Sequence, residues 1–164
     1  MENIKLTPLT QADYVIVKDI YDWYVLNSTA TFHTEPINVD ELAGFMYLND
    51  PVFQSFLIKQ ADEVVGYCYT TRYKNRQAYD RTAEVTLYLK HDLTGRGIGV
   101  SALSQLEEIA RKNGLRTLLA IITGENKNSI RLFEKCGYEK CAHFKRVGEK
   151  FGRILDVVGY QKEL

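Results

Sequence analysis

The residues with the clearest chemical signal lie at 94–100, where three glycines alternate with other residues in the run Thr-Gly-Arg-Gly-Ile-Gly-Val. A strand-like run at 82–90 precedes this stretch, and apolar residues at spacings of three and four follow it, which favours a helix. A strand that turns through glycines into a helix points unpaired backbone N–H groups, and the positive end of the helix dipole, at one spot. Glycine also lets the backbone approach a ligand without a Cβ clash. The stretch therefore predicts a site for a pyrophosphate-bearing cofactor.

The glycine spacing argues against two common nucleotide sites. A dinucleotide-binding fold requires G-x-G-x-x-G early in a βαβ unit, with an acidic residue about 20 positions later. Here the glycines read G-x-G-x-G in mid-chain. A triphosphate-binding loop requires Gly-Lys-Ser/Thr, whereas Gly99 is followed by Val100. A flexible turn would also explain three isolated glycines, so the interpretation depends on a second segment.

That second segment is 126–138, Asn-Lys-Asn-Ser-Ile-Arg-Leu-Phe-Glu-Lys-Cys-Gly-Tyr. It follows the apolar run 118–122, which suits a strand buried on both faces. Asn126 can cap a helix, and Gly137 can end that helix in the left-handed conformation. The predicted helix would bury Ile130, Leu132 and Phe133.

The remaining elements alternate between strand-like and helix-like patterns, which favours a mixed α/β fold. Thr10 and Asp13 form a capping box for a first helix. The predicted buried face of that helix carries Val17, Ile20, Tyr21 and Tyr24. A second helix is predicted over 39–48. Strands are predicted over 4–7, 53–59, 64–73 and 82–89, with one or two more over 138–160.

Bulk composition indicates a small globular protein. A chain of 164 residues fits one domain, 1–164, and can bury a sizeable core. The 21 basic and 21 acidic residues balance, which argues against a nucleic-acid or membrane-surface partner held by charge. The three cysteines lack metal-site spacing, and neither a secretion signal nor a long apolar span is seen, so we expect a reduced, cytoplasmic protein. The three histidines are scattered, and no metal site is expected.

The two segments together resemble the signature of the GNAT acetyltransferase superfamily. Residues 94–100 are similar to its acetyl-CoA pyrophosphate loop, and 126–138 to the helix that lies along the pantetheine arm. Residues 73–84, 27–36 and 147–157 are similar to segments of phosphinothricin and methionine sulfoximine acetyltransferases, so the resemblance covers nearly the whole chain. It implies a splayed mixed sheet flanked by about four helices, with acetyl-CoA as co-substrate. It also implies a homodimer in which 147–157 of each chain completes the neighbour's site; a simple terminal hairpin is the alternative explanation of that stretch.

Glu84 matches the family's general-base position. Period-2 alternation places Glu84, Thr86 and Tyr88 on one face of their strand. A buried carboxylate has a raised pKa and is then a better base near neutral pH; an ion pair with Arg81 is the alternative explanation. Arg96, Lys127 and Arg131 are candidates for the outer phosphates, and a solvated surface position is the alternative explanation for each of them. The resemblance implies that acetyl-CoA contacts Leu87, Tyr88, Leu89, Thr94, Gly95, Arg96, Gly97, Ile98, Gly99, Val100, Asn126, Ser129 and Phe133.

Acceptor recognition is expected near the start of the Glu84 strand, where cations cluster. An amino-acid-like acceptor carries a carboxylate, and the planar fork of arginine binds two oxygens at once. Core or loop packing would explain Phe32 as well as acceptor binding does. The resemblance implies acceptor contacts from Phe32, Lys74, Arg76, Tyr79, Thr82, Val85 and Thr86.

Two positions depart from the family pattern. Thr94 stands where a glutamine or arginine usually opens the phosphate loop, and the loss is modest if backbone groups do most of the phosphate binding. Phe133 stands where tyrosine or histidine is usual, and phenylalanine cannot donate a proton to the leaving thiolate. Water, another tyrosine, or departure as the thiolate itself would then complete the reaction.

Three functions are compatible with these residues. The first is transfer of the acetyl group of acetyl-CoA to the primary amine of a small amino acid or analogue, of the phosphinothricin and methionine sulfoximine or sulfone type. The second is acetylation of a peptide or protein N-terminus, which the cationic acceptor segment disfavours. The third is a CoA-binding module with weakened catalysis, which Phe133 favours and Glu84 disfavours.

Overall fold

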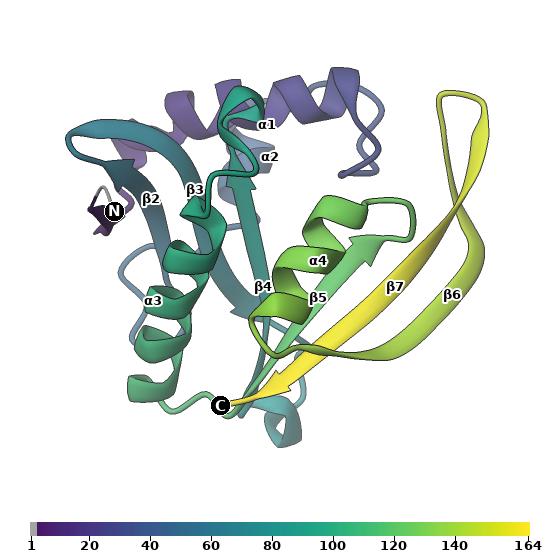
Figure 1. The fold of residues 1–164 in the computed structure, drawn as a ribbon. Coiled ribbons are helices and arrows are strands. Elements are labelled where there is room, and N and C mark those ends of the chain that lie inside the picture. Colours follow the sequence, from purple (N-terminus) through teal and green to yellow (C-terminus); the bar gives the residue numbers. More distant parts are fainter. Residues whose placement is uncertain (1–2) are drawn as a thin grey trace.

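A seven-stranded mixed sheet runs through the part of the chain that the structure describes, residues 3–164, in the computed structural model shown in Figure 1. Short 3-10 turns precede α1, β4 and α3. In chain order the elements are β1 (Ile4–Pro8), α1 (Tyr14–Asn27), α2 (Val39–Ala43), β2 (Ser55–Gln60), β3 (Glu63–Arg72), β4 (Thr82–Leu89), α3 (Ile98–Lys112), β5 (Thr117–Thr123), α4 (Lys127–Lys135), β6 (Glu139–Lys150) and β7 (Arg153–Glu163).

The sheet opens between its two central strands. The strand order is β1-β2-β3-β4-β5-β7-β6; β4 and β5 run parallel, and the other neighbouring strands pair antiparallel. The pairing of β4 with β5 extends only from Thr82–Thr117 to Glu84–Leu119. Beyond Glu84 the two strands separate, as Figure 1 shows. The prediction of a splayed mixed sheet flanked by helices is therefore confirmed.

Two apolar clusters occupy the two faces of the sheet. Ala83, Val85 and Leu89 of β4 are buried in a cluster that includes the apolar side of α3. Tyr88 points the other way and packs against the cluster that contains the apolar side of α1. The alternation predicted for β4 is thus confirmed, and it places Glu84 and Thr86 on the α1 face.

The first helix begins much as predicted. The backbone N–H of Thr10 donates a hydrogen bond of 2.8 Å to the Asp13 carboxylate, although the first turn is a 3-10 turn and α1 starts at Tyr14. Val17, Ile20 and Tyr21 are buried as expected.

Two expectations about other elements are wrong. The helix predicted over 39–48 ends at Ala43, because Gly44 closes the last turn by donating its N–H to the carbonyls of Asp40 and Glu41. The apolar residues that follow pack beneath α1 from a turn instead. The strand at 118–122 is not buried on both faces, since Ile121 is 51% exposed on its open side.

Candidate functional site

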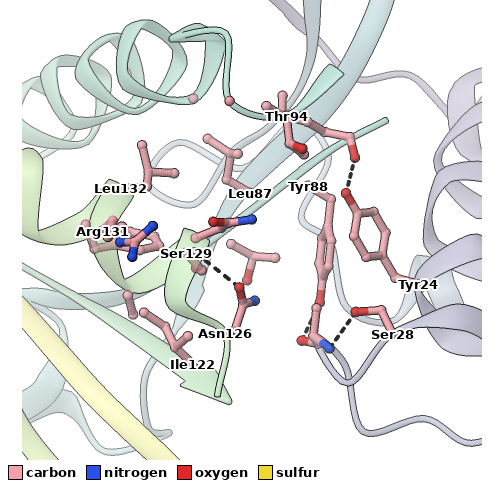
Figure 2. A pocket seen from close by; sticks show the side chains of 18 of the residues that line it. Tyr24, Ser28, Leu87, Tyr88, Thr94, Ile122, Asn126, Ser129, Arg131 and Leu132 are labelled. Atoms are coloured by element: carbon pink, nitrogen blue, oxygen red, sulfur yellow. Dashed lines mark hydrogen bonds between the residues drawn. The ribbon is translucent and has the colours of Figure 1, made fainter. Parts of the chain in front are cut away.

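The separation of β4 and β5 opens into a cavity of about 620 Å³, a volume typical of small-molecule and cofactor sites. Figure 2 shows Asn126, which precedes α4, and Ser129 of α4 on one side of this cavity, with Tyr24 and Tyr88 on the other. The predicted cofactor residues that line it are Leu87, Tyr88, Leu89, Thr94, Gly95, Gly97, Gly99, Val100, Asn126, Ser129 and Phe133.

Two predicted cofactor residues lie outside the lining. Ile98 is buried in the α3 cluster, so its side chain belongs to the core and only its backbone is at the turn. Arg96 is exposed, and its guanidinium donates a hydrogen bond of 3.4 Å to the carbonyl of Asp92. In this structure the Arg96 side chain therefore bonds to the backbone that precedes the glycine turn.

The glycine turn has the conformation that an anion site requires. Gly95 and Gly97 have φ angles of 77° and 79°, which residues with a side chain rarely adopt. Gly97 caps α3, and the N–H of Ser101 is the first to bond back to it. The N–H groups of the preceding helical residues consequently have no acceptor within the helix and point out of its N-terminus. This turn offers the positive end of α3 to the cavity.

The N-terminus of α4 meets the same cavity. The Asn126 side chain accepts a hydrogen bond of 3.2 Å from the N–H of Ser129, so the predicted helix cap is present. Arg131, a predicted phosphate candidate, lines the cavity, whereas Lys127 does not. Leu132 was expected in the core; it is half-buried, lines the cavity and packs where a Cβ on Gly99 would come within 3.0 Å.

The edge of β4 beyond Glu84 is the natural binding surface for an extended ligand. Residues 85–89 still pair with β3 on one side, but their pairing with β5 has ended. Backbone groups on that side face the cavity and can bond the amides of a ligand. The hydroxyl of Tyr24 donates to the carbonyl of Leu89, which fastens α1 to the end of this edge.

Glu84 lies where the strands separate. Its side chain is half-buried, and burial raises the pKa of its carboxyl above the ordinary value. It forms no ion pair with Arg81, whose guanidinium instead lies 3.8 Å from the Glu163 carboxylate. A carboxylate with a raised pKa and no ion pair among residues 3–164 is free to accept a proton.

Tyrosine rings pack between β4 and α1. The ring of Tyr88 packs against those of Tyr21, Tyr24 and Tyr67, with centroids 5.0–5.8 Å apart. Burial raises the pKa of Tyr69 to about 12, although a hydrogen bond with Thr86 opposes the shift. These hydroxyls therefore stay protonated at neutral pH and act as hydrogen-bond donors.

The predicted acceptor residues are divided. Val85 and Thr86 line the cavity, whereas Phe32, Lys74, Arg76, Tyr79 and Thr82 do not. Lys74 lies over the rings of Tyr73 and Tyr79 in the β3–β4 loop. Phe32 packs against the β6–β7 hairpin, where a Cβ on Gly148 would come within 2.6 Å of its ring. In one chain, then, only two of these residues share the cavity with the cofactor residues.

Sequence reasoning missed the wall that α1 and its following loop provide. Trp23, Tyr24, Ser28 and Ala30 line the cavity, as does His91. The rings of Trp23 and His91 stack 4.0 Å apart, almost parallel. The amphipathic pattern of α1 was the available signal, but it placed Tyr24 in the core and gave no hint of a cavity. Lys135 at the end of α4 also lines the cavity, although the sequence does not predict this.

Neither a metal site nor a membrane span emerges from the part of the chain that the structure describes. Within residues 3–164, no group of three or more His, Cys, Asp or Glu side chains is placed to hold a metal ion. Among the same residues, no helix combines the length and apolar character needed to cross a membrane.

Comparison with known proteins identifies the family. Residues 6–158 match the acetyltransferase (GNAT) domain. An L-methionine sulfoximine/L-methionine sulfone acetyltransferase of Pseudomonas paraeruginosa is 31% identical over 155 residues, covering 93% of this chain and 90% of its own length. A phosphinothricin N-acetyltransferase of Streptomyces coelicolor is 28% identical over 167 residues, covering 99% and 97%.

A solved structure gives the same result. The GNAT superfamily phosphinothricin acetyltransferase of Sinorhizobium meliloti, in complex with AcCoA, superposes with a TM-score of 0.90 and 31% identity. The match covers 98% of this chain and 88% of that one. With its splayed sheet, its glycine turn and its capped α4, the present chain belongs to the GNAT acetyltransferase family.

Proposed function

We propose that this acetyltransferase transfers the acetyl group of acetyl-CoA to the primary amine of a small amino acid or analogue, of the phosphinothricin and methionine sulfoximine or sulfone type. The main support is the position of Glu84, a half-buried carboxylate at the point where β4 and β5 separate. Relatives named for these acceptors align with nearly the whole chain.

Acetyl-CoA would occupy the cavity between the strands. Its pyrophosphate would lie at the N-terminus of α3, held by the backbone of residues 95–100. The pantetheine arm would run along the free edge of β4 at 87–89 and past Asn126 and Ser129. Arg131 and Lys135 would face the outer phosphates. The Sinorhizobium meliloti structure with bound AcCoA supports this placement by analogy.

The chemistry follows from the position of the base. Glu84 would take a proton from the acceptor ammonium, directly or through a water. The neutral amine then attacks the thioester carbon, and N–H donors on the free edge of β4 stabilise the oxyanion. The C–S bond breaks and CoA leaves as the thiolate. The pKa of Glu84, raised by burial, makes proton removal more favourable than it would be for an exposed carboxylate.

Acceptor recognition would combine the cavity with the β3–β4 loop. Val85 and Thr86 line the cavity near Glu84, and Thr82 begins the same strand. Lys74 and Arg76 remain the proposed partners of an acceptor carboxylate. Both lie in the β3–β4 loop, and both are outside the cavity lining, as Glu84 is.

We further propose a cytoplasmic homodimer. The β6–β7 hairpin reaches past the end of β5 (Figure 1). Apolar side chains of β5 and of this hairpin remain exposed. Such a cluster is typical of a protein–protein contact. Light scattering coupled to size exclusion would give twice the mass of one chain. The exposed side chains are Ile121, Phe144, Val147, Phe151 and Ile154, each 47–60% accessible.

A thiol-release assay tests the proposed reaction. Acetyl-CoA would be offered with phosphinothricin, methionine sulfoximine, methionine sulfone, a panel of free amino acids and short peptides. We expect turnover with the glutamate-like analogues and none with peptides. Turnover with peptides alone would replace the proposed acceptor. If no compound in the panel caused thiol release while acetyl-CoA still bound, the result would indicate another acceptor class or a module that only binds CoA.

A further inference from the structure

Glu125 joins three parts of the chain that are distant in sequence. Its carboxylate accepts two hydrogen bonds of 2.8 Å from the guanidinium of Arg153, at the start of β7. It also accepts one of 2.6 Å from the hydroxyl of Thr29, in the loop after α1. A carboxylate that receives a bidentate arginine and a hydroxyl is held in one orientation. Glu125 directly precedes Asn126, the residue that caps α4.

The loop reached by this cluster, residues 28–36, forms part of the cavity wall. Ser28 and Ala30 line the cavity, and the hydroxyl of Tyr88 donates to the carbonyl of Ala30. In Figure 2, Ser28 lies across the cavity from Asn126. The 28–36 loop and the N-terminus of α4 are therefore opposite walls of one site, and Glu125 with Thr29 connects them.

Further contacts fasten the loop at the same end. The hydroxyl of Thr123, at the end of β5, donates a hydrogen bond of 2.6 Å to the carbonyl of Thr29. The buried ammonium of Lys150, in the β6–β7 hairpin, donates one of 2.8 Å to the carbonyl of Thr31. These two bonds hold the backbone of the loop. The Glu125 cluster is different, since it fixes the Thr29 side chain against the residue next to the α4 cap.

We propose that Glu125 is a positioning residue which, with Thr29 and Arg153, sets the 28–36 loop against the N-terminus of α4 and so fixes the acceptor side of the cavity. Its effect on catalysis rests on the proposed function, because it assumes that acetyl-CoA lies on the α4 side. The acceptor then contacts the 28–36 loop. The cluster of Glu125, Thr29 and Arg153 sets the distance between this loop and the thioester of acetyl-CoA. Loosening the wall weakens acceptor binding and leaves cofactor binding intact.

Matched changes at Thr29 separate the hydroxyl from the rest of the side chain. Thr29→Val removes the hydroxyl at nearly constant shape and keeps the carbonyl that Thr123 uses, whereas Thr29→Ser retains the hydroxyl. Glu125→Gln removes the negative charge from the acceptor of the Thr29 hydrogen bond and so tests the contribution of the carboxylate. Thr34→Val makes the same change in the same loop, at an exposed hydroxyl without a hydrogen-bond partner among residues 3–164.

Hydrogen exchange of the ligand-free protein and steady-state kinetics are the two measurements. We expect amides of 28–35 to exchange roughly threefold faster or more in Thr29→Val and Glu125→Gln, with Thr29→Ser and Thr34→Val at the wild-type rate. The KM for the acceptor rises about five- to tenfold in the first two variants, with kcat and acetyl-CoA affinity near wild type.

Several results would overturn the proposal. One is a wild-type rate of hydrogen exchange for the loop amides in Thr29→Val. Another is an increase in exchange in Thr29→Ser as large as that in Thr29→Val. A parallel loss of kcat, cofactor affinity and melting temperature would show general damage instead of positioning. Because exchange needs neither acceptor nor cofactor, it decides the loop's attachment even if the acceptor panel is silent. Such silence would count against the proposed function alone.

Discussion

The ring of Phe133 packs edge-on against that of Tyr138, with centroids 4.9 Å apart and planes at 79°. Phe133 is buried and lines the cavity with carbon atoms alone. The hydroxyl of Tyr138 lies inside the protein, and burial raises its pKa, so it is a poor proton donor to a group in the cavity. Neither ring offers the leaving sulfur a proton. A thiol with a pKa near 8.5 can instead depart as the thiolate.

Phe133→Tyr tests whether the sulfur needs a proton donor. If thiolate departure does not limit the rate, the added hydroxyl changes kcat by less than about threefold. Steady-state kinetics with the best acceptor would measure this, with Phe133→Leu as a control for packing. A gain of tenfold or more would mean that the missing hydroxyl limits catalysis.

Glu84→Gln tests the proposed base. We expect kcat/KM to fall by about 10²- to 10⁴-fold, because the amide keeps the shape of the side chain but cannot accept the proton. The acetyl-CoA dissociation constant, measured by calorimetry, should stay within about twofold since Glu84 lies outside the cavity lining. Glu63→Gln, at an exposed position on β3, is the matched control. Turnover that survived Glu84→Gln would assign the base to another group.

The pH dependence of kcat/KM should also report the ionisation of Glu84. Burial raises the pKa of Glu84 above its ordinary 4.5, and only the ionised form is a base. Activity should therefore fall as the pH drops through this raised pKa, which puts the midpoint of the acidic limb above 4.5. A pH series on wild type and Glu84→Gln would check it. Persistence of the same limb in the glutamine variant would attribute it to a different group.

Gly97→Ala should separate the anion site from fold stability. Gly97 has a φ of 79° and caps α3, so alanine there adds backbone strain of about 1–2 kcal/mol at the proposed pyrophosphate site. Gly114, after α3, has a φ of 95° with open space around it. Both alanine variants should lower the melting temperature, but only Gly97→Ala should weaken acetyl-CoA binding, by about tenfold. Equal affinity in the two variants would place the pyrophosphate elsewhere.

The glycine turn before α3 and the cap of α4 were predictable because their geometry is local. A turn with positive φ and a capped helix are each encoded within a few neighbouring residues, so the segments at 94–100 and 126–138 could be read directly. The period-2 pattern likewise placed Glu84 on the correct face of β4. These features need no knowledge of what packs against them.

The opposite wall of the site was not predictable for the converse reason. Tyr24 and His91 line the cavity only because α1 crosses the end of β4, a long-range contact without a local signal. The two errors in the fold have different causes. Gly44 ends α2 although the apolar spacing continues, and Ile121 is exposed because the sheet opens beside it. Hydrophobic pattern alone does not tell which apolar side chains the fold leaves uncovered.

The ion pair of Glu125 and Arg153 should make stability sensitive to acid. Hydrogen bonds from Arg153 and Thr29 lower the pKa of Glu125 from 4.5 to about 2 in the folded protein. Because the folded pKa lies below the unfolded one, the pair contributes fully above about pH 4.5, and the contribution is lost as the pH falls towards 2. The effect is small, since both side chains are partly exposed.

Arg153→Met removes the partner and should return the pKa of Glu125 towards its ordinary value. Urea unfolding of the two proteins should differ most near neutral pH, and the difference should shrink as the pH falls below about 4.5. Arg153→Lys keeps the charge without the bidentate fork and should fall between them. A difference that stayed constant across this range would mean that Arg153 stabilises the fold through its packing and not through Glu125.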